Sequence, residues 1–595
     1  MRDTINKEIE AIENNKWDSF LKSVGDKPTN STAFWRKINM HKRKSNGIKT
    51  IEFENKLYCT DFEKANLFSN IMANTFKEDS NNHNFNTDFK RDITNKVNIT
   101  LNGNKPENEI VKLISMKELN ETIKRLNTKS SSGLDGISNK IIKNLPEQMK
   151  KTILNLFNQS ILESKISENW KKAEITMIPK KNNDLQNPKS YRPISMNSCL
   201  SKLCEKLILT RIKNHLKINN IIIKQQSGFR QHRQTKDNLL FLIQKIQETL
   251  TRKKKVISFF FDISQAFDKI WHDGLIFKLI QTKLPFYLIK WIQFYLQDRL
   301  FCVKIGSYTS EFKRIECGVP QGAVLSPVLF CIYINDIPAV FIKNKSYSLL
   351  FADDLVSFFI FKKANNINIQ IKNYLQHLEN WLDNWRLTMH PTKCNFMTFN
   401  NNSNKSLNEK FNHKLYNERI PACNSLKFLW ITFDLGLTFN NHTKDIKKRC
   451  INRLNIIKIL SNKRWKLTTT TLKSIYLSLI RSVIDYSSLI MPFLSKSLAK
   501  TIQATQNTAL RCIYKLNYRT STEEVTRISN IVTIKTRADT LNKNYIQNCI
   551  INRNPLILDL INEYKSGGKN FKNKTFLCTQ IASLPNVVTI NYPQS

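Results

Sequence analysis

The sequence has 595 residues and a formal net charge of +45, because 93 Lys and Arg residues outnumber 48 Asp and Glu residues. A chain of this length exceeds what one hydrophobic core usually organises. A surface this basic repels itself unless a polyanion such as nucleic acid neutralises it. A codon bias toward Lys and Asn would account for part of the excess of basic residues. The sequence has no secretory signal, no apolar run of membrane-spanning length and no zinc or disulfide spacing among its 12 cysteines, which argues against secreted, membrane and zinc-finger proteins and indicates a reducing, intracellular location.

Residues 1–110 are expected to form an N-terminal extension that is helical and partly disordered. Its first part contains amphipathic helical stretches. The segment from Asp79 to Asn104 is rich in Asn and weakly patterned, which is typical of a linker. This linker would separate the extension from the main body of the chain.

Residues 111–435 are expected to form an α+β body. Their apolar periodicity is sustained, and helix-like windows such as Glu147–Glu163 alternate with strand-like windows such as Glu174–Ile178. The mixture of the two periods indicates that sheets and helices share a core.

The chain beyond Gly436 is expected to be helical. Strand signals largely stop there, and Leu, Ile and Tyr recur at three- and four-residue spacing from Lys444 to Leu516. We therefore place a helical domain at 436–520 and leave 521–595 as a C-terminal tail region.

A buried strand is expected to present Asp262. The run from Val256 to Phe261 is mainly β-branched and aromatic, and a helical pattern starts in the segment Ser264–Asp268 that follows it. The sequence therefore predicts a carboxylate at the C-terminal end of an apolar strand.

A β-hairpin with two acids at its tight turn is predicted further along the chain. Tyr347–Phe351 leads into an Ala-Asp-Asp segment and Leu355–Phe361 leads out of it. The apolar flanks place Asp353 and Asp354 at the edge of a core, where unpaired carboxylates repel each other and lose hydration. Divalent cations remove that cost, so the pair together with Asp262 indicates a metal site more strongly than a turn or capping role.

Carboxylates of this kind suit a pair of hard cations. Two such ions can lower the pKa of an attacking hydroxyl and neutralise a leaving pyrophosphate, which is the two-metal scheme of polymerases. Asp262 and Asp353 would ligate both ions, and Asp354 would be a weaker or outer ligand. Mg²⁺ is the expected cofactor, with Mn²⁺ as an alternative.

A glycine-punctuated loop, Cys317–Gly322, lies between the two acidic segments of the sequence. Ser326 is expected to cap the helix that follows, with Pro327 at its first position, and this helix is expected to continue through Tyr333. Glycines let a backbone approach a ligand closely, and Gln321 on the loop could hydrogen-bond a nucleotide or a template strand. Taken alone, the loop would be only a turn.

Three of these segments resemble motifs A, B and C of reverse transcriptases in order and spacing. They are Phe261–Asp268, Gly318–Pro327 and Phe351–Asp354. Other segments resemble the finger motifs, motif D and the primer-grip motif E of the jockey-like branch of non-long-terminal-repeat (LINE-type) retrotransposons: Gly133–Ile137, Trp170–Lys180, Tyr191–Ser195, Ser227–Arg230, Met389–Cys394 and Leu426–Trp430. The resemblance covers residues 110–520, with a motif core at 161–434.

The resemblance implies an α+β right-hand polymerase fold with fingers, a palm that holds an antiparallel sheet, and a helical thumb. In this fold, residues 111–435 would form fingers and palm, and 436–520 the thumb. Asp262, Asp353 and Asp354 match the catalytic, metal-binding positions of the palm.

The resemblance also implies a binding site for the incoming dNTP. Lys180 and Arg192 match finger positions that grip the triphosphate, as suits the affinity of cations for phosphate oxygens. Phe267 matches the steric gate against a ribose 2′-OH, although a core Phe at a helix start is a fair alternative. Gln321 and Gly322 match the loop that positions template and nucleotide.

Lys393 matches a candidate proton donor to pyrophosphate. A solvated loop lysine explains this position nearly as well, so both interpretations stay open.

Two features depart from the family pattern. Leu429 and Trp430 lie at the primer-grip position, where Trp430 replaces the usual Gly and puts primer handling in doubt. The pair Phe34-Trp35 resembles the spacer that joins an endonuclease to the polymerase in such elements, so we expect the chain to lack the N-terminal endonuclease.

The sequence therefore predicts an RNA-directed DNA polymerase of a non-LTR retrotransposon. It would bind an RNA template, a DNA primer and dNTPs, with no membrane partner, in the nucleus and in cytoplasmic ribonucleoprotein, and no oligomeric state follows from the sequence. A group II intron reverse transcriptase and an RNA-directed RNA polymerase are alternatives, against which the finger motifs and Phe267 argue. A catalytically decayed copy that retains only RNA binding is a further alternative, which Trp430 favours and the intact aspartates disfavour.

Overall fold

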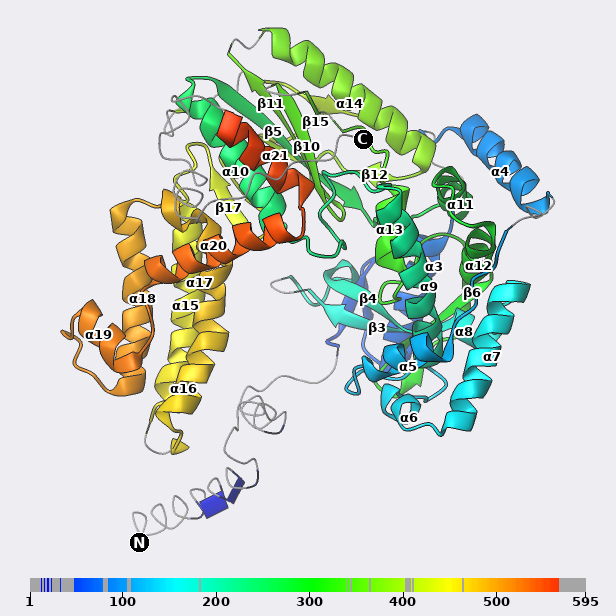
Figure 1. Ribbon diagram of the computed structural model, residues 1–595, viewed down its shortest axis with the longest axis horizontal. Helices are drawn as coiled ribbons and strands as arrows, with labels where there is room; N and C mark the ends of the chain where they lie inside the picture. The colour runs from blue at the N-terminus through cyan, green and yellow to red at the C-terminus, as the bar shows by residue number, and fades with distance from the viewer. Residues whose placement is uncertain are drawn as a thin grey trace.

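The computed structural model of the chain (Figure 1) is a mixture of helices and sheets, as predicted. It describes residues 48–78, 84–103, 109–180, 183–339, 341–342, 345–362, 365–401, 408, 411–462 and 465–566, and single residues at 12, 15, 16, 19, 20, 23 and 33. The predicted spacer pair Phe34-Trp35 lies outside the described residues.

The central sheet has the strand order β12-β5-β11-β10-β9, with β13 also paired to β5. Its pairings are antiparallel. Its strands are β5 (Lys255–Ser264), β9 (Phe341–Ile342), β10 (Ser346–Phe351), β11 (Asp354–Phe361), β12 (Thr388–Met389) and β13 (Asn395–Phe399). The register of β5 on β11 runs from Lys255 opposite Phe361 to Asp262 opposite Asp354, so both predicted acidic segments lie at the same end of the sheet.

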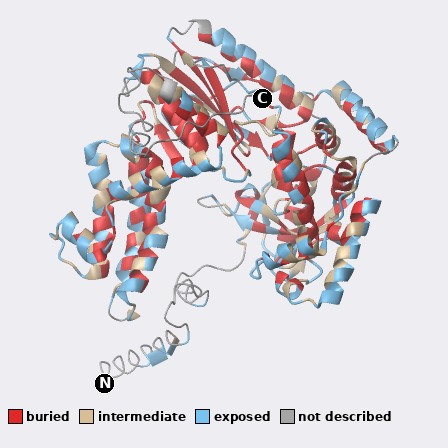
Figure 2. Cartoon of the chain, in the orientation of Figure 1, coloured by how far each residue is buried: buried red, intermediate tan, exposed pale blue. Residues whose placement is uncertain are grey.

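The two faces of β5 belong to two hydrophobic cores. Ile257, Phe259 and Phe261 pack into one core, and Val256 and Phe260 pack into the other. Successive side chains of a strand point to opposite faces, so a strand covered on both sides has a continuous apolar run. Figure 2 shows this burial along the strands of the sheet.

Helices cover both faces of the central sheet (Figure 1). The core that contains Phe259 also includes side chains of α4 (Thr87–Asn102), α5 (Met116–Lys124), α7 (Glu147–Glu163), α9 (Cys199–Ile218), α11 (His272–Gln281), α12 (Phe286–Leu296), α13 (Ser326–Tyr333) and α14 (Asn365–Trp385). The core that contains Phe260 includes side chains of α10 (Thr235–Thr251), α20 (Ile534–Ile551) and α21 (Pro555–Ser566).

A second sheet has the order β4-β3-β6-β7, with β8 also paired to β6. Its strands are β3 (Lys172–Pro179), β4 (Tyr191–Met196), β6 (Arg299–Ile305), β7 (Tyr308–Thr309) and β8 (Lys313–Ile315). Strand β3 pairs antiparallel with β4 and parallel with β6. Helix α3 (Asp61–Phe76) packs on this sheet through Phe68 and Met72, and the small hairpin β1 (Ile51–Phe53) and β2 (Lys56–Tyr58) precedes it.

The chain beyond Gly436 is helical through residue 566, as the sequence predicts for its first part. The helices are α15 (Asn440–Leu460), α16 (Thr469–Tyr476), α17 (Ser482–Tyr486), α18 (Lys496–Tyr514) and α19 (Thr522–Ser529), which share a core of their own, followed by α20 and α21. Within the described residues, no helix is both long enough and apolar enough to cross a membrane.

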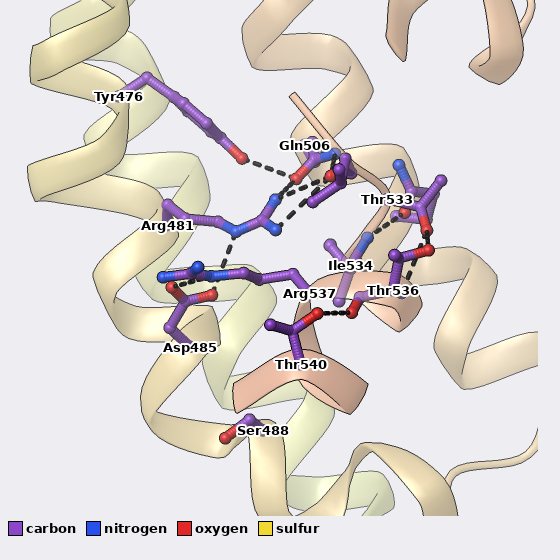
Figure 3. Close-up of polar contacts among 12 residues, drawn as sticks. Tyr476, Arg481, Asp485, Ser488, Gln506, Thr533, Ile534, Thr536, Arg537 and Thr540 are labelled. Carbon is purple, nitrogen blue, oxygen red and sulfur yellow. Dashed lines mark hydrogen bonds and ion pairs between the residues drawn. The ribbon is translucent and has the colours of Figure 1, made fainter. Parts of the chain in front are cut away.

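Polar contacts join this helical region to α20 (Figure 3). Asp485 of α17 accepts hydrogen bonds from Nε of Arg481 at 3.1 Å and from Nε of Arg537 at 3.2 Å. Gln506 of α18 accepts a hydrogen bond from Tyr476 at 2.8 Å and donates one to the carbonyl of Val532 at 3.1 Å. These partly buried pairs fix α20 against α17 and α18.

The sequence predicted no fold for the region 521–595. In the structure, the described part of this region packs back against the helices of the central sheet. Tyr545 of α20 donates a hydrogen bond to Asp237 of α10 at 2.7 Å, and Lys224 pairs with Asp559 of α21 at 2.7 Å. Residues 522–566 are therefore helices packed into the protein, and 567–595 lie outside the described residues.

Several local predictions are confirmed. Helix α7 spans Glu147–Glu163, the strand window Glu174–Ile178 lies within β3, and the helix after the glycine loop ends at Tyr333. Strands β10 and β11 form the predicted hairpin. Only one of the two acids lies in its turn, which is Ala352-Asp353, because Asp354 is the first residue of β11 and pairs with Phe351.

The predicted linker Asp79–Asn104 is wrong over most of its length. Residues Thr87–Asn102 form α4, with the side chain of Asn86 accepting a hydrogen bond from the backbone N–H of Phe89. Ile93, Val97 and Leu101 are buried at four-residue spacing in the core that contains α11. The segment has weak helix propensity, because its narrow apolar stripe lies among Asn and Thr residues. Packing against neighbouring helices therefore supplies the stability of this helix.

Two predicted helix starts are also wrong. After β5 the chain makes turns from Gln265 to Lys269, and the helix begins only at His272, so Asp262 lies two residues before the strand ends. Ser326 is the first residue of α13 and not its cap, because its hydroxyl donates a hydrogen bond back to the carbonyl of Pro320 at 2.8 Å.

Candidate active site

Asp262 and Asp354 face each other on adjacent strands, and Asp353 lies in the turn beside them. The Cα atoms of Asp262 and Asp354 are partners in the register of β5 on β11, a relation that puts Cα atoms about 4.5–5.5 Å apart. The hairpin turn consists of Ala352 and Asp353, and Ala352 has φ +55°. A tight hairpin requires such left-handed backbone, which a small side chain tolerates better than a bulky one.

The side chain of Gln226 binds the backbone of this turn. Gln226 is 1% exposed, and its Oε1 accepts hydrogen bonds from the backbone N–H of Ala352 at 3.0 Å and of Gly228 at 2.7 Å. A Cβ atom on Gly228 would lie 2.2 Å from the Ala352 nitrogen, so only glycine allows this approach. The position of Asp353 therefore depends on a segment far from it in the sequence.

The pKa values of Asp353 and Asp354 are raised. Burial raises the pKa of Asp353, and the neighbouring Asp262 adds to the effect. Burial, together with Asp353 and Asp262, raises the pKa of Asp354 to about 6. In the part of the chain that the structure describes, no three His, Cys, Asp or Glu side chains are gathered tightly enough to form a metal site as they stand. The set nevertheless fits Mg²⁺ or Mn²⁺ chemically, since it offers hard oxygen donors whose repulsion a divalent cation would relieve.

One cleft of about 1130 Å³ is lined by both acidic and basic side chains. Asp262 and Asp353 lie in its wall together with Lys180, Arg192 and Lys393. Burial and the proximity of Arg192 and Lys393 lower the pKa of Lys180, while Asp262 opposes this shift. The cations and the carboxylates therefore share one electrostatic environment.

The second sheet positions two of these cations. Arg192 lies in β4 opposite Ile178 of β3, and Lys180 directly follows β3. The Nζ atom of Lys180 donates a hydrogen bond to the carbonyl of Lys189 at 2.8 Å, which directs the lysine toward the segment just before β4. Both side chains therefore reach the cleft from the paired strands β3 and β4.

Phe267 lies in the same cleft, in the turn that follows β5. Its ring stacks on Phe330 of α13 with centroids 4.7 Å apart and contacts the edge of Phe229 at 6.0 Å. Two aromatic neighbours thus fix the orientation of a ring that is only partly buried.

Gln321 and Gly322 also line the cleft, at the tip of the glycine loop. The Nε2 atom of Gln321 lies 2.9 Å from each carboxylate oxygen of Asp268, and its backbone carbonyl accepts a hydrogen bond from Ser195 of β4 at 2.8 Å. Gly322 has φ +109°, where a side chain would be strained. The loop is thus tied both to the turn after β5 and to the second sheet.

The sequence matches known proteins over the part that builds this cleft. Residues 178–433 match the family described as reverse transcriptase (RNA-dependent DNA polymerase). Residues 178–433 belong to the reverse transcriptase family.

Three relatives of this chain come from Drosophila melanogaster, and they confirm the jockey-like character predicted from the motifs. The "Probable RNA-directed DNA polymerase from transposon BS" is 30% identical over 482 residues, which are 80% of this chain and 52% of the relative. The "RNA-directed DNA polymerase from mobile element jockey" is 26% identical over 91% of this chain and 58% of its own length, and the "Probable RNA-directed DNA polymerase from transposon X-element" is 29% identical over 84% and 54%. The chain therefore spans about half the length of the curated relatives it matches.

The reverse transcriptase domain brings together most of the predicted site residues. Asp262, Asp353, Lys180, Arg192, Phe267, Gln321, Gly322 and Lys393 line one cleft. The lining of this cleft does not include Asp354, Leu429 or Trp430. Leu429 and Trp430 form the turn between β16 (Ser425–Phe428) and β17 (Ile431–Asp434), outside the cleft.

The sequence did not indicate two positioning residues of the reverse transcriptase domain. Gln226 holds the Asp353 turn, and Asp268 holds Gln321 in the glycine loop. Burial raises the pKa of Asp268 to about 6, while the hydrogen bond from Gln321 opposes this shift. Both residues lie inside or beside segments with family resemblance, but only the folded chain shows what their side chains contact.

Proposed function

We propose that the chain is an RNA-directed DNA polymerase of a non-LTR retrotransposon, which extends a DNA 3′-OH on an RNA template with dNTPs. The observation that carries this proposal is that Asp262 and Asp353 share one cleft with Lys180 and Arg192. Cations near metal-binding carboxylates suit a nucleoside triphosphate, because the cations bind phosphate oxygens and the carboxylates hold its divalent ion.

Each predicted site residue has a proposed role. Asp262, Asp353 and Asp354 would hold Mg²⁺ or Mn²⁺, which when bound lowers the pKa of the attacking hydroxyl and neutralises the leaving pyrophosphate. Lys180 and Arg192 would bind the triphosphate. Three further roles remain: sugar selection by Phe267, positioning of template and nucleotide by Gln321 and Gly322, and proton donation to pyrophosphate by Lys393.

The parts of the fold support a right-hand arrangement. The central sheet would be the palm, the second sheet with its helices the fingers, and α15–α18 the thumb, with the turn Leu429-Trp430 as part of the primer grip. An RNA template and a DNA primer would be polyanionic partners that suit the net charge of +45. We further propose a location in the nucleus and in cytoplasmic ribonucleoprotein, as expected for such an element.

A catalytically decayed copy that retains only RNA binding is the second candidate. Trp430 favours it, because a bulky ring stands at the primer-grip turn where the family usually has Gly. Decay by this route would leave the cleft intact and still prevent productive placement of a primer.

The deciding experiment is primer extension on poly(rA)/oligo(dT) with Mg²⁺. Asp353→Asn keeps the volume of the side chain and removes its charge, so extension is expected to fall by roughly 10³-fold or more while template-primer binding in a filter assay persists. Asp88→Asn on the exposed surface of α4 is the matched control and should extend like the wild type. An active wild type that Asp353→Asn leaves unchanged would refute the proposed catalytic site, and a wild type that binds but never extends would favour the decayed copy.

A further inference from the structure

The turn that carries Trp430 adopts a backbone that tryptophan rarely takes. Leu429 has φ +43° and Trp430 has φ +67°, in a two-residue turn between β16 and β17. Left-handed backbone favours Gly, and a bulky residue there is strained. Leu429 is 8% exposed, whereas Trp430 is 61% exposed, so the turn buries the first side chain and directs the second into solvent.

Contacts on the buried side hold this turn in place. The hydroxyl of Tyr486 donates a hydrogen bond to the carbonyl of Leu429 at 2.8 Å and lies 3.1 Å from the hydroxyl of Thr235 at the start of α10. The ring of Phe428, directly before the turn, packs on Phe260 with centroids 5.4 Å apart. Phe260 lies two residues before Asp262 in β5 and therefore on the same face of that strand. The exposed ring is thus presented from a rigid support next to the acidic end of the sheet.

The exposed ring lines a basic cavity of about 550 Å³. The other lining residues are Lys427, Thr432, His442, Asp445, Lys448, Arg449 and Asn452. Nζ of Lys427 lies 4.3 Å from the centre of the Trp430 ring. Lys427, Lys448 and Arg449 are exposed, and Asp445 is the only acidic residue among those lining the cavity.

We propose that Trp430 is a stacking platform for a nucleotide of the bound template-primer, with the adjoining phosphates on Lys427, Lys448 and Arg449. This inference rests on the proposed polymerase function and goes beyond it, because it makes Trp430 a binding residue where the family pattern has Gly. Bases stack on exposed aromatic rings, and flanking cations bind the phosphates, without a need for sequence readout. The ring would add a contact with the nucleic acid at the primer grip and would not impair primer binding.

The test uses the full chain and a labelled poly(rA)/oligo(dT) duplex, with affinity measured by fluorescence anisotropy. Trp430→Gly is expected to weaken binding by about 10-fold, the size of effect that loss of one base–aromatic stack causes. Trp430→Phe, which keeps a ring, should retain most of the affinity. Tyr518→Ala is the matched control, since Tyr518 is 72% exposed beside Arg519 but does not line the cavity, and it should bind like the wild type.

Loss of binding in Trp430→Gly cannot be mistaken for unfolding. Glycine accepts φ +67° without strain, so the melting temperature of this variant should stay equal or rise while its affinity falls. Equal or tighter binding by Trp430→Gly, with extension equal to or better than the wild type's, would overturn the platform and identify the ring as an obstruction. A wild type that never extends, together with weaker binding by Trp430→Gly, would instead keep the platform and refute the polymerase proposal.

Discussion

The side-chain oxygen of Gln226 accepts a hydrogen bond from the backbone N–H of Ala352 at 3.0 Å, across a sequence separation of 126 residues. The same oxygen accepts the N–H of Gly228, whose missing side chain lets the two segments approach. The contact fixes the hairpin turn that carries Asp353. Two segments, each resembling a separate motif of the family, therefore act together to position a carboxylate.

Replacement of Gln226 with Ala should loosen that turn. Two buried N–H groups would lose their acceptor, which costs about 1–3 kcal/mol of stability per group in proteins. We expect kcat for primer extension to fall by about 10-fold or more, since small displacements of catalytic groups have effects of this size. The Mg²⁺ concentration for half-maximal rate should rise, and template-primer affinity should stay within a factor of two, or ~0.4 kcal/mol.

The matched control is Gln159→Ala on the exposed face of α7, which should change neither rate nor Mg²⁺ dependence. Unchanged kinetics in a folded Gln226→Ala protein would show that the turn holds its geometry without this hydrogen bond.

Replacement of Phe267 with Val should relax sugar selection. The smaller side chain removes the ring that stacks on Phe330 and would collide with a 2′-OH. Incorporation of rNTPs relative to dNTPs is expected to rise roughly 10- to 200-fold, the range over which pocket shape discriminates small groups. Single-nucleotide insertion with matched dNTP and rNTP measures it, and Phe312→Val, at an exposed ring, is the control. Unaltered discrimination would leave Phe267 as a packing residue only.

Asp268 should give the protein a measurable pH dependence. Its pKa in the folded chain, about 6, lies above the usual range of an aspartate side chain, so protonation favours folding and this contribution is lost as the pH rises from about 4 to about 6. Asp268→Asn cannot ionise and keeps a hydrogen-bond acceptor for Gln321. Its unfolding free energy relative to the wild type should therefore be higher at pH 7 than at pH 4 by up to about 3 kcal/mol. Urea unfolding at the two pH values tests this, and an equal difference at both would contradict the assignment.

Template-primer affinity should depend steeply on salt. Each phosphate neutralised by Lys or Arg contributes about −0.7 to −0.9 to the slope of log K against log salt concentration. With a net charge of +45, a slope corresponding to several contacts is expected in a filter-binding titration from low to physiological salt. A flat response would mean that the excess of Lys reflects codon bias and not a binding surface.

The sequence by itself determined the features that arise from local periodicity and turn chemistry. The apolar run up to Asp262 predicts a buried strand, and the two apolar runs around the Ala-Asp-Asp segment predict a β-hairpin, both of which the structure contains. Helix α7 follows in the same way from its three- and four-residue spacing. These signals lie within a few residues of the elements they specify, so they can be interpreted without knowledge of the fold.

Only the tertiary structure decided the contacts between distant segments. The weakly patterned residues of α4 become a helix because their apolar stripe packs on other helices. Ser326 bonds back into the glycine loop and does not cap α13. Nor could local pattern show that Gln226 holds the turn before Asp354, or that Trp430 faces a basic cavity. Such contacts bring together residues that are far apart in the sequence, and side-chain periodicity carries information only about neighbours along the chain.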